Sequence, residues 1–292
     1  NSESFRDYVK NERIYVNPSF LFNVSDKTLI TVQGDYLSAD WTPDFGTGII
    51  GKTILDLPRN TYYGALWSTG KTKSSSASVL VNHDFNSNWK LSFNSSFQSY
   101  NRTQKSTAQL SSIDVNGNWK RGLTQADASE KIFGDQLSLQ GTFNTGSIKH
   151  QIFTGVDYEN SMAPSYTFGF YANPNGTTAL TTEATAINLF NYDYSTQSLT
   201  APYSTRRTQL ATTDTQRFGV YAQDLISITD YVKVLAGLRW SWQESEVTTS
   251  KEVIGKVNGV DTITTTLENA IPTTGTKTLN RAYSPKAGLV IQ

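Results

Sequence analysis

The clearest alternation of apolar and polar residues runs through residues 217–242. From Val232 onward every second residue is apolar up to Trp242, and the residues between are mostly polar or small. Side chains on a strand alternate between two faces, so this pattern predicts a strand with one apolar and one polar face. A similar strand begins near Phe218, and residues 228–230 are short enough to reverse the chain. The segment therefore predicts a hairpin about 25 residues long, with strands longer than the usual five or six residues.

The same pattern occurs three more times and predicts three more hairpins. Their strands and turns are 14–24, 25–27 and 28–38; 77–85, 86–88 and 89–98; and 137–143, 144–147 and 148–159, with a last strand near Tyr283. Much longer segments separate the hairpins: 41–75, 102–130, 161–214 and 247–280. Loops above about 15 residues are uncommon in compact soluble domains, whereas outer-membrane barrels alternate short turns with long loops. We therefore predict an all-β, antiparallel transmembrane β-barrel, of which nine or ten strands are visible.

Composition is consistent with this fold and excludes some kinds of chemistry. Hydrophobic residues make up only 37% of the chain, yet aromatic residues reach 12%. A soluble β-sandwich would share this profile, so the order of short and long connections carries the prediction. The formal net charge is zero and gives no sign of a nucleic-acid partner. Cysteine is absent, which excludes disulfides and thiol chemistry. Both ends read as mid-barrel sequence, so we expect residues 1–292 to be one barrel domain that is incomplete at both ends.

Five segments, in order along the chain, resemble a known family. They are NERIYVNPSFLFNVSDKTLITVQGDYLSADWTPDFG, LPRNTYYG, HQIFTGVDYEN, RFGVYAQDLISITDYVKVLAGLRW and YSPKAGLVIQ. They resemble the barrels of TonB-dependent outer-membrane receptors, particularly the ferric-siderophore receptors related to the ferrichrome type. The resemblance spans nearly the whole chain. It does not extend to the family's N-terminal plug domain or its later strands.

The resemblance implies a 22-stranded barrel in the bacterial outer membrane that imports ferric siderophores. Its expected partners are the siderophore, outer-membrane lipids and, through the plug domain, the TonB–ExbB–ExbD energy-coupling complex. It implies no catalytic activity and no resident cofactor, with iron arriving only as a siderophore chelate. Three alternatives stay open: a receptor for another nutrient (a glycan, a peptide or cobalamin), a complete ten-stranded barrel acting as an enzyme or adhesin, or a soluble β-sandwich.

Candidate ligand-binding residues are aromatic and cationic side chains in and around the first and third long loops, where they could hold an anionic, partly apolar chelate. They are Trp41, Phe45, Arg59, Tyr62, Tyr63, Trp67, Tyr166, Phe168 and Tyr171. The alternative for each ring is that it holds the loops together. A second set of aromatic residues near predicted strand ends suits the membrane interface: Phe85, Trp89, Tyr231, Trp240 and Trp242. The only histidines, His83 and His150, lie near short turns and are expected to be structural, and Gln223, Asp224 and Arg239 are expected on the lumen side or its margin.

Overall fold

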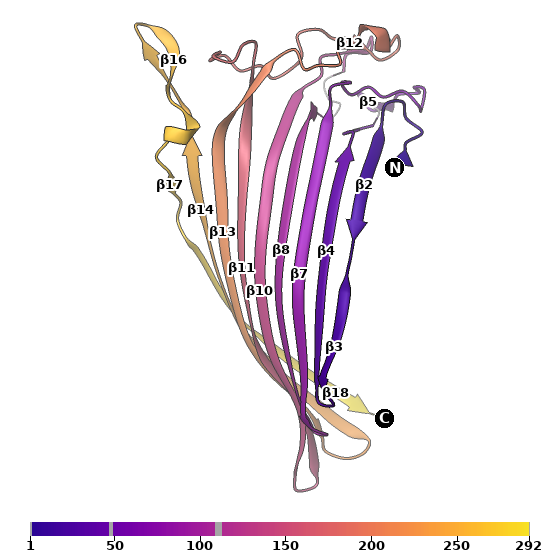
Figure 1. Cartoon of the computed structure of the whole chain (residues 1–292), viewed down its shortest axis with the longest axis vertical. Coiled ribbons are helices and arrows are strands. Elements are labelled where there is room, and N and C mark those ends of the chain that lie inside the picture. The colour runs from indigo at the N-terminus through magenta and orange to yellow at the C-terminus, as the bar shows by residue number, and fades with distance from the viewer. Residues whose placement is uncertain (1, 47–48, 109–112, 292) are drawn as a thin grey trace.

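The described residues of this computed structural model, 2–46, 49–108 and 113–291, form one long, curved antiparallel sheet (Figure 1). Each long strand pairs with the next along the chain, so the sheet is an up-and-down meander. Its main strands are β2 (Lys10–Val16), β3 (Ser19–Ser25), β4 (Thr28–Trp41), β7 (Thr69–Asn86), β8 (Trp89–Thr107), β10 (Leu123–Thr145), β11 (Ile148–Tyr171), β13 (Ser204–Ser227), β14 (Val232–Lys251) and β18 (Thr278–Ile291). A two-residue strand, β1 (Ser2–Glu3), extends the edge beside β2.

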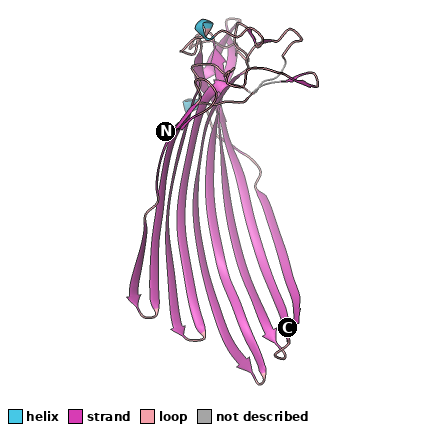
Figure 2. Ribbon diagram, turned by 90° about the vertical axis from the view of Figure 1, so that its right-hand side faces the viewer, coloured by secondary structure: helices cyan, strands magenta, loops and turns pink. Residues whose placement is uncertain are grey.

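The four predicted short turns are confirmed, and all lie at one end of the sheet (Figure 2). Four connections lie at the opposite end, and we name their described residues loop A (42–46 and 49–68), loop B (108 and 113–122), loop C (172–203) and loop D (252–277). Loop A contains β5 (Ile49–Ile50) and β6 (Thr53–Ile54), and loop B contains β9 (Asn118–Trp119). Loop C contains β12 (Ile187–Asn188) and the 3₁₀ helix η1 (Tyr194–Thr196). Loop D contains β15 (Val253–Val257), β16 (Val260–Thr265), η2 (Leu267–Asn269) and β17 (Thr273–Thr274).

The predicted loop boundaries are wrong because the strands continue well beyond the alternating pattern. β11 and β13 have 24 residues each, a length of about 80 Å at roughly 3.3 Å per residue. An apolar band about 25 Å tall cannot cover such a strand, so its loop-side end stands outside the membrane. There both faces are polar, as in Lys71–Ser76, and no alternation marks the strand.

The predicted strand 14–24 is divided into β2 and β3 by Asn17 and Pro18. Proline has no backbone N–H and interrupts the ladder of hydrogen bonds. The neighbouring strand adapts, because the Gly34 N–H donates to the Pro18 carbonyl at 3.0 Å and the Asn17 side chain donates to the Gly34 carbonyl at 3.0 Å. The break therefore leaves the pairing with β4 continuous.

The sheet has one apolar and one polar face, as the alternation predicts. Paired residues such as Val220 and Trp240, or Leu137 and Phe93, lie on the apolar face. Residues between them lie on the polar face, where the Arg239 guanidinium donates to both carboxylate oxygens of Asp157 at 2.7 and 2.8 Å. In an outer-membrane barrel the apolar face contacts lipid and the polar face lines the lumen.

Among the described residues, no helix is long and apolar enough to cross a membrane. The sheet order places β2 and β3 at one edge of the described sheet and β18 at the other.

Candidate ligand site at the loop end of the sheet

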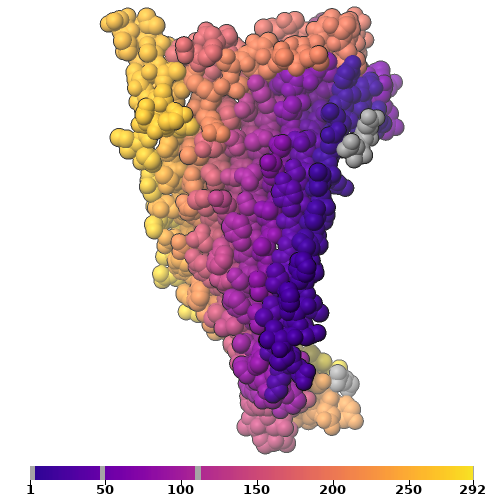
Figure 3. Space-filling model, viewed as in Figure 1, coloured from indigo at the N-terminus to yellow at the C-terminus, as the bar shows by residue number. Residues whose placement is uncertain are grey.

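Loops A, B and C fold together into a single cluster with its own hydrophobic core. Leu57 and Tyr63 of loop A pack with Trp119 of loop B and with Ile187 and Leu189 of loop C. β9 and β12 pair across loops B and C, with Trp119 opposite Ile187. We call these three loops together the loop cluster. The β15–β16 hairpin of loop D lies away from it, at the upper left of the space-filling view (Figure 3).

A buried arginine of loop B joins the three loops electrostatically. Arg121 is only 5% exposed, and its Nε donates to the carboxylate of Glu183 in loop C. Its Nη1 donates to the loop A carbonyl of Gly64 at 3.1 Å, and its Nη2 donates to Gln197 Oε1 at 2.8 Å. The guanidinium therefore has partners in both other loops. Nothing in the local pattern of loop B marked this residue.

The predicted ligand residues Tyr62, Tyr63, Trp67 and Tyr171 are almost fully buried. The Tyr62 hydroxyl donates to the Pro43 carbonyl at 2.9 Å, while its backbone N–H donates to the Tyr194 hydroxyl at 2.7 Å. The Trp67 ring packs edge-on against Tyr203. In this conformation Tyr62, Tyr63 and Trp67 join loop A to loop C, whereas the Tyr171 ring lies 3.7 Å from the Arg206 guanidinium of β13. Whether any of them contacts a ligand stays a prediction.

Burial raises the pKa values of five tyrosines in the cluster: Tyr62, Tyr63, Tyr192, Tyr194 and Tyr203. Tyr62 and Tyr192 each have a pKa raised to about 12, in both cases mainly because burial penalises the charged phenolate. A folded-state pKa above the unfolded value means that the stabilisation is complete below pH ~10 and is lost as pH rises towards 12.

We therefore predict that the loop cluster opens between about pH 10 and pH 12 while the sheet stays folded. Tyrosinate absorbance should show a group of tyrosines that titrates late, and limited proteolysis should show loops A and C becoming accessible over the same interval. In a Tyr62→Phe variant, one late-titrating group should disappear. Loop opening complete below pH 10 would contradict the assignment.

Tyr171, at the end of β11, and three further predicted residues lie on strands rather than in loops. Trp41 is the last residue of β4, and Tyr166 and Phe168 lie within β11. The Tyr166 ring lies 4.0 Å from the Arg207 guanidinium, which also pairs with Asp127. The sequence pattern missed this because the polar upper parts of the strands read as loop.

Trp41 belongs to a platform that crosses three strands of the polar face. Its indole lies over Gly70 of β7, where any Cβ would meet the ring at about 2.5 Å. Its Nε1 donates to Thr72 Oγ1 at 3.1 Å, and the Arg102 guanidinium of β8 lies 5.2 Å from the ring. We call Trp41, Gly70, Thr72, Arg102 and Gln104 the Trp41–Arg102 platform. Sequence reasoning missed Arg102 because it placed residue 102 at the start of a loop.

The remaining predicted ligand residues, Phe45 and Arg59, are exposed in loop A. The Arg59 guanidinium lies 5.6 Å from the ring of Phe5, whose other neighbour is the Arg6 guanidinium at 5.7 Å. Arg6 is fixed by an ion pair to Asp44 at 3.0 Å and by donation to the Thr61 carbonyl at 3.1 Å. An accessible aromatic and cationic surface therefore exists on the loop A side of the loop cluster.

The predicted interface aromatics fall at two heights along the sheet. Phe85, Trp89 and Tyr231 lie at the short turns, whereas Trp240 and Trp242 lie in the middle of β14 rather than at a strand end. A tilted strand crosses the hydrocarbon core in about 9 to 11 residues, which is close to the separation of Tyr231 from the two tryptophans. Their contact with the membrane interface stays a prediction.

Both histidines have protein partners on the apolar face near the short turns. His83 Nδ1 lies 2.8 Å from Thr28 Oγ1, and His150 Nδ1 lies 2.6 Å from a carboxylate oxygen of Asp224. The His150 ring also stacks on Phe143. Arg239 and Gln223 lie on the polar face as expected, but the prediction for Asp224 is wrong, because the alternation puts it on the apolar face opposite Ile152.

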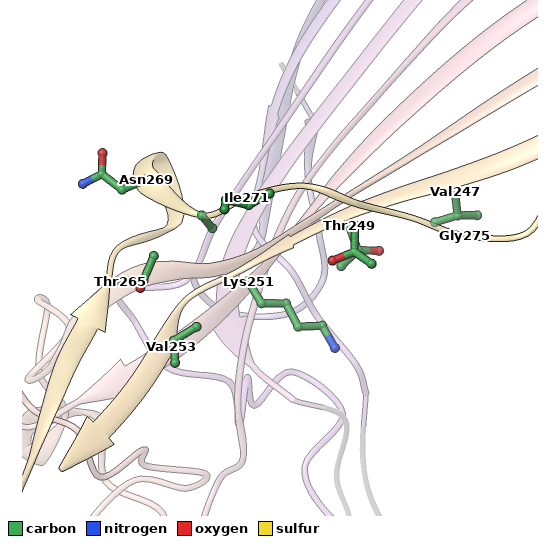
Figure 4. Close-up of a pocket in the computed structure, with 10 residues that line it drawn as sticks. Val247, Thr249, Lys251, Val253, Thr265, Asn269, Ile271 and Gly275 are labelled. Carbon is green, nitrogen blue, oxygen red and sulfur yellow. The ribbon is translucent and has the colours of Figure 1, made fainter.

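A cavity lies at the loop-side end of β14, away from the loop cluster. This cavity of about 700 Å³ is lined by β14 and loop D, including Val247, Lys251 and Ile271. Its side chains are spread along several segments and do not converge on one point (Figure 4). No group of three or more metal-ligating side chains occurs in residues 2–46, 49–108 and 113–291.

The sequence profile of the family described as TonB dependent receptor-like, beta-barrel, matches residues 16–292. The chain belongs to this family. Its sheet is thus part of an outer-membrane β-barrel, in agreement with the fold class and location expected from the sequence. The family comprises receptors and not enzymes.

Two curated relatives are chelate receptors. The catecholate siderophore receptor Fiu of Escherichia coli is 25% identical over 292 residues, which covers 92% of this chain and 37% of Fiu. The metal-pseudopaline receptor CntO of Pseudomonas aeruginosa is 27% identical over 161 residues, covering 54% of this chain and 22% of CntO. The chain therefore spans well under half the length of these relatives.

Solved structures show the same fold. The open form of the ferric-catecholate import receptor Fiu from Escherichia coli aligns with a TM-score of 0.75 at 24% identity, covering 98% of this chain and 45% of that one. The siderophore receptor PiuA from Acinetobacter baumannii aligns with a TM-score of 0.75 at 19% identity, covering 100% of this chain and 42% of that one.

Proposed function

We propose that this chain is the mouth-forming part of an outer-membrane receptor that imports ferric siderophores. The observation that carries the proposal is the similarity to a catecholate siderophore receptor along 92% of the chain. The aromatic and cationic surface at the loop end supports it, because such groups bind an anionic, partly apolar chelate through stacking and charge. Iron is then cargo inside its chelator, and the protein needs no resident cofactor.

Energy would come from the inner membrane through TonB and its ExbB and ExbD partners, which would act on a plug domain of the whole receptor. The short turns would face the periplasm and the loop cluster would face the outside, because outer-membrane barrels have short periplasmic turns and long extracellular loops. Outer-membrane lipids would contact the apolar face. The receptor would be a transporter without a catalytic step.

The test is iron uptake by cells that lack the gene for the whole receptor, grown under iron limitation. We expect loss of uptake of a ferric catecholate and restoration by the gene on a plasmid, with uptake of iron from an unrelated chelator as the matched control. Unchanged uptake of every ferric chelate would overturn the proposal. If the cells instead lose uptake of a glycan, a peptide or cobalamin, the result would favour a receptor for another nutrient.

A further inference from the structure

The arginines of this chain fall into two groups according to their partners. In the described residues, six arginines form ion pairs with carboxylates, and they are Arg6, Arg121, Arg206, Arg207, Arg217 and Arg239. Arg102 has no carboxylate partner within that part of the chain. It is nevertheless held in place on a central strand of the sheet, unlike a freely moving surface cation.

The platform positions the guanidinium from two sides. Arg102 Nη2 donates to Gln104 Oε1 at 2.7 Å, and Gln104 in turn donates to Ser106 Oγ at 2.9 Å. Gln104 and Ser106 are both buried, so this chain of hydrogen bonds is fixed. On the other side the Arg102 guanidinium lies over the Trp41 ring, 5.2 Å from the ring centroid. Only one of the five N–H donors of Arg102 is used by this bond, and the side chain is exposed.

The direction of Arg102 follows from the alternation along β8. Lys90, Ser92, Asn94, Ser96 and Gln98 define its polar face, and Arg102 has the same parity. It therefore points into the lumen, near the end of β8 that enters the loop cluster. A ligand that passes the loops and enters the barrel would meet this guanidinium and the adjacent indole.

From this geometry we infer that the Trp41–Arg102 platform recognises negative charge on the incoming chelate. This inference rests on the proposed function and deepens it, because it names the chemical class of the ligand: an anionic ferric complex with planar aromatic arms, as in a tris-catecholate. Arg102 donates hydrogen bonds to the catecholate oxygens, and Trp41 offers a flat surface to an aromatic arm. A neutral ferric hydroxamate supplies neither feature.

The experiment measures the affinity of the purified whole receptor in detergent for two probes, an iron(III) tris-catecholate and a neutral iron(III) tris-hydroxamate. Arg102→Gln removes the cation and keeps a polar side chain. Its affinity for the tris-catecholate should fall about tenfold or more, as expected for charge-assisted hydrogen bonds. Its affinity for the hydroxamate should stay at the wild-type value, whether weak or strong.

Two further variants separate charge recognition from folding and from general electrostatics. Lys73→Gln removes an exposed cation of β7 at a similar height on the opposite face, where Lys73 pairs with Asn101. Its affinity for both probes should be unchanged. Arg102→Lys keeps the charge but loses the planar fork, so its affinity should lie between those of Arg102→Gln and wild type. Thermal unfolding of each variant confirms that the barrel is intact.

The outcomes distinguish this inference from the proposed function. A wild-type receptor that binds the tris-catecholate while Arg102→Gln binds it equally well overturns the inference and leaves the function standing. The inference is also overturned if Lys73→Gln loses as much affinity for the tris-catecholate as Arg102→Gln does. It is overturned as well if Arg102→Gln loses affinity equally for the neutral probe. A wild-type receptor that binds neither probe and takes up no ferric chelate in cells overturns both.

Discussion

Replacing Arg121 by methionine should release the loop cluster without unfolding the barrel. Arg121 is the only residue of the cluster that bonds to loop A and loop C at once within the described part of the chain. Removing one partner of a buried ion pair leaves the other charge unpaired, which costs roughly 3–5 kcal/mol. Here the uncompensated charge is Glu183, whose side chain is 9% exposed. A penalty of this size would raise the population of opened loops by more than a hundredfold.

Hydrogen exchange of the receptor in detergent is the measurement. Amides of loops A, B and C should all exchange faster in Arg121→Met, while those of β10 and β11 keep their protection. Lys120→Met is the matched control, because Lys120 is adjacent and exposed. A double variant that also carries Glu183→Gln should recover part of the protection, since no buried charge is then left alone. Wild-type protection in Arg121→Met would show that the hydrophobic core alone holds the loops.

The sequence was sufficient to predict those parts of the chain where lipid dictates the residues. Lipid-facing positions must be apolar and lumen-facing positions can be polar, so residues 217–242 predicted both the strands and the turn between them. Outside the membrane this requirement ends. β13 continues through Thr205–Gln216 with polar residues on both faces, and only its pairing with β11 and β14 shows that it is a strand.

The candidate site was less predictable because its residues are brought together by long-range contacts. Tyr63 and Leu189 are 126 residues apart, yet the Tyr63 hydroxyl donates to the Leu189 carbonyl. An aromatic residue in a long loop is equally compatible with ligand binding and with a small loop core. Whether the ring is buried distinguishes these two roles, and its burial depends on how the other loops pack around it. Trp41 and Arg102 illustrate the same limit, since the glycine that lets them meet lies on a third strand.

A second substitution tests whether the three loops behave as one cooperative unit. Trp119 is 2% exposed and lies between loop A and loop C. Trp119→Ala removes the largest side chain of the loop core and leaves a cavity, which costs about 3–5 kcal/mol for a buried tryptophan. Leu57 and Ile187, which share the loop core with it, belong to the two other loops, so the lost packing energy destabilises all three loops.

The expected result is coupled opening at sites that the tryptophan does not touch. In hydrogen exchange, residues near Tyr62 in loop A and near Gln197 in loop C should lose protection together and to the same extent, as they should in Arg121→Met. The β15–β16 hairpin of loop D is an internal control, because it stands outside the cluster (Figure 3). Val115→Ala is the control substitution, since Val115 lies in the same loop but is 81% exposed. Opening confined to loop B would mean that the loops are independent, and the positioning of the mouth above the Trp41–Arg102 platform would then depend on each loop separately.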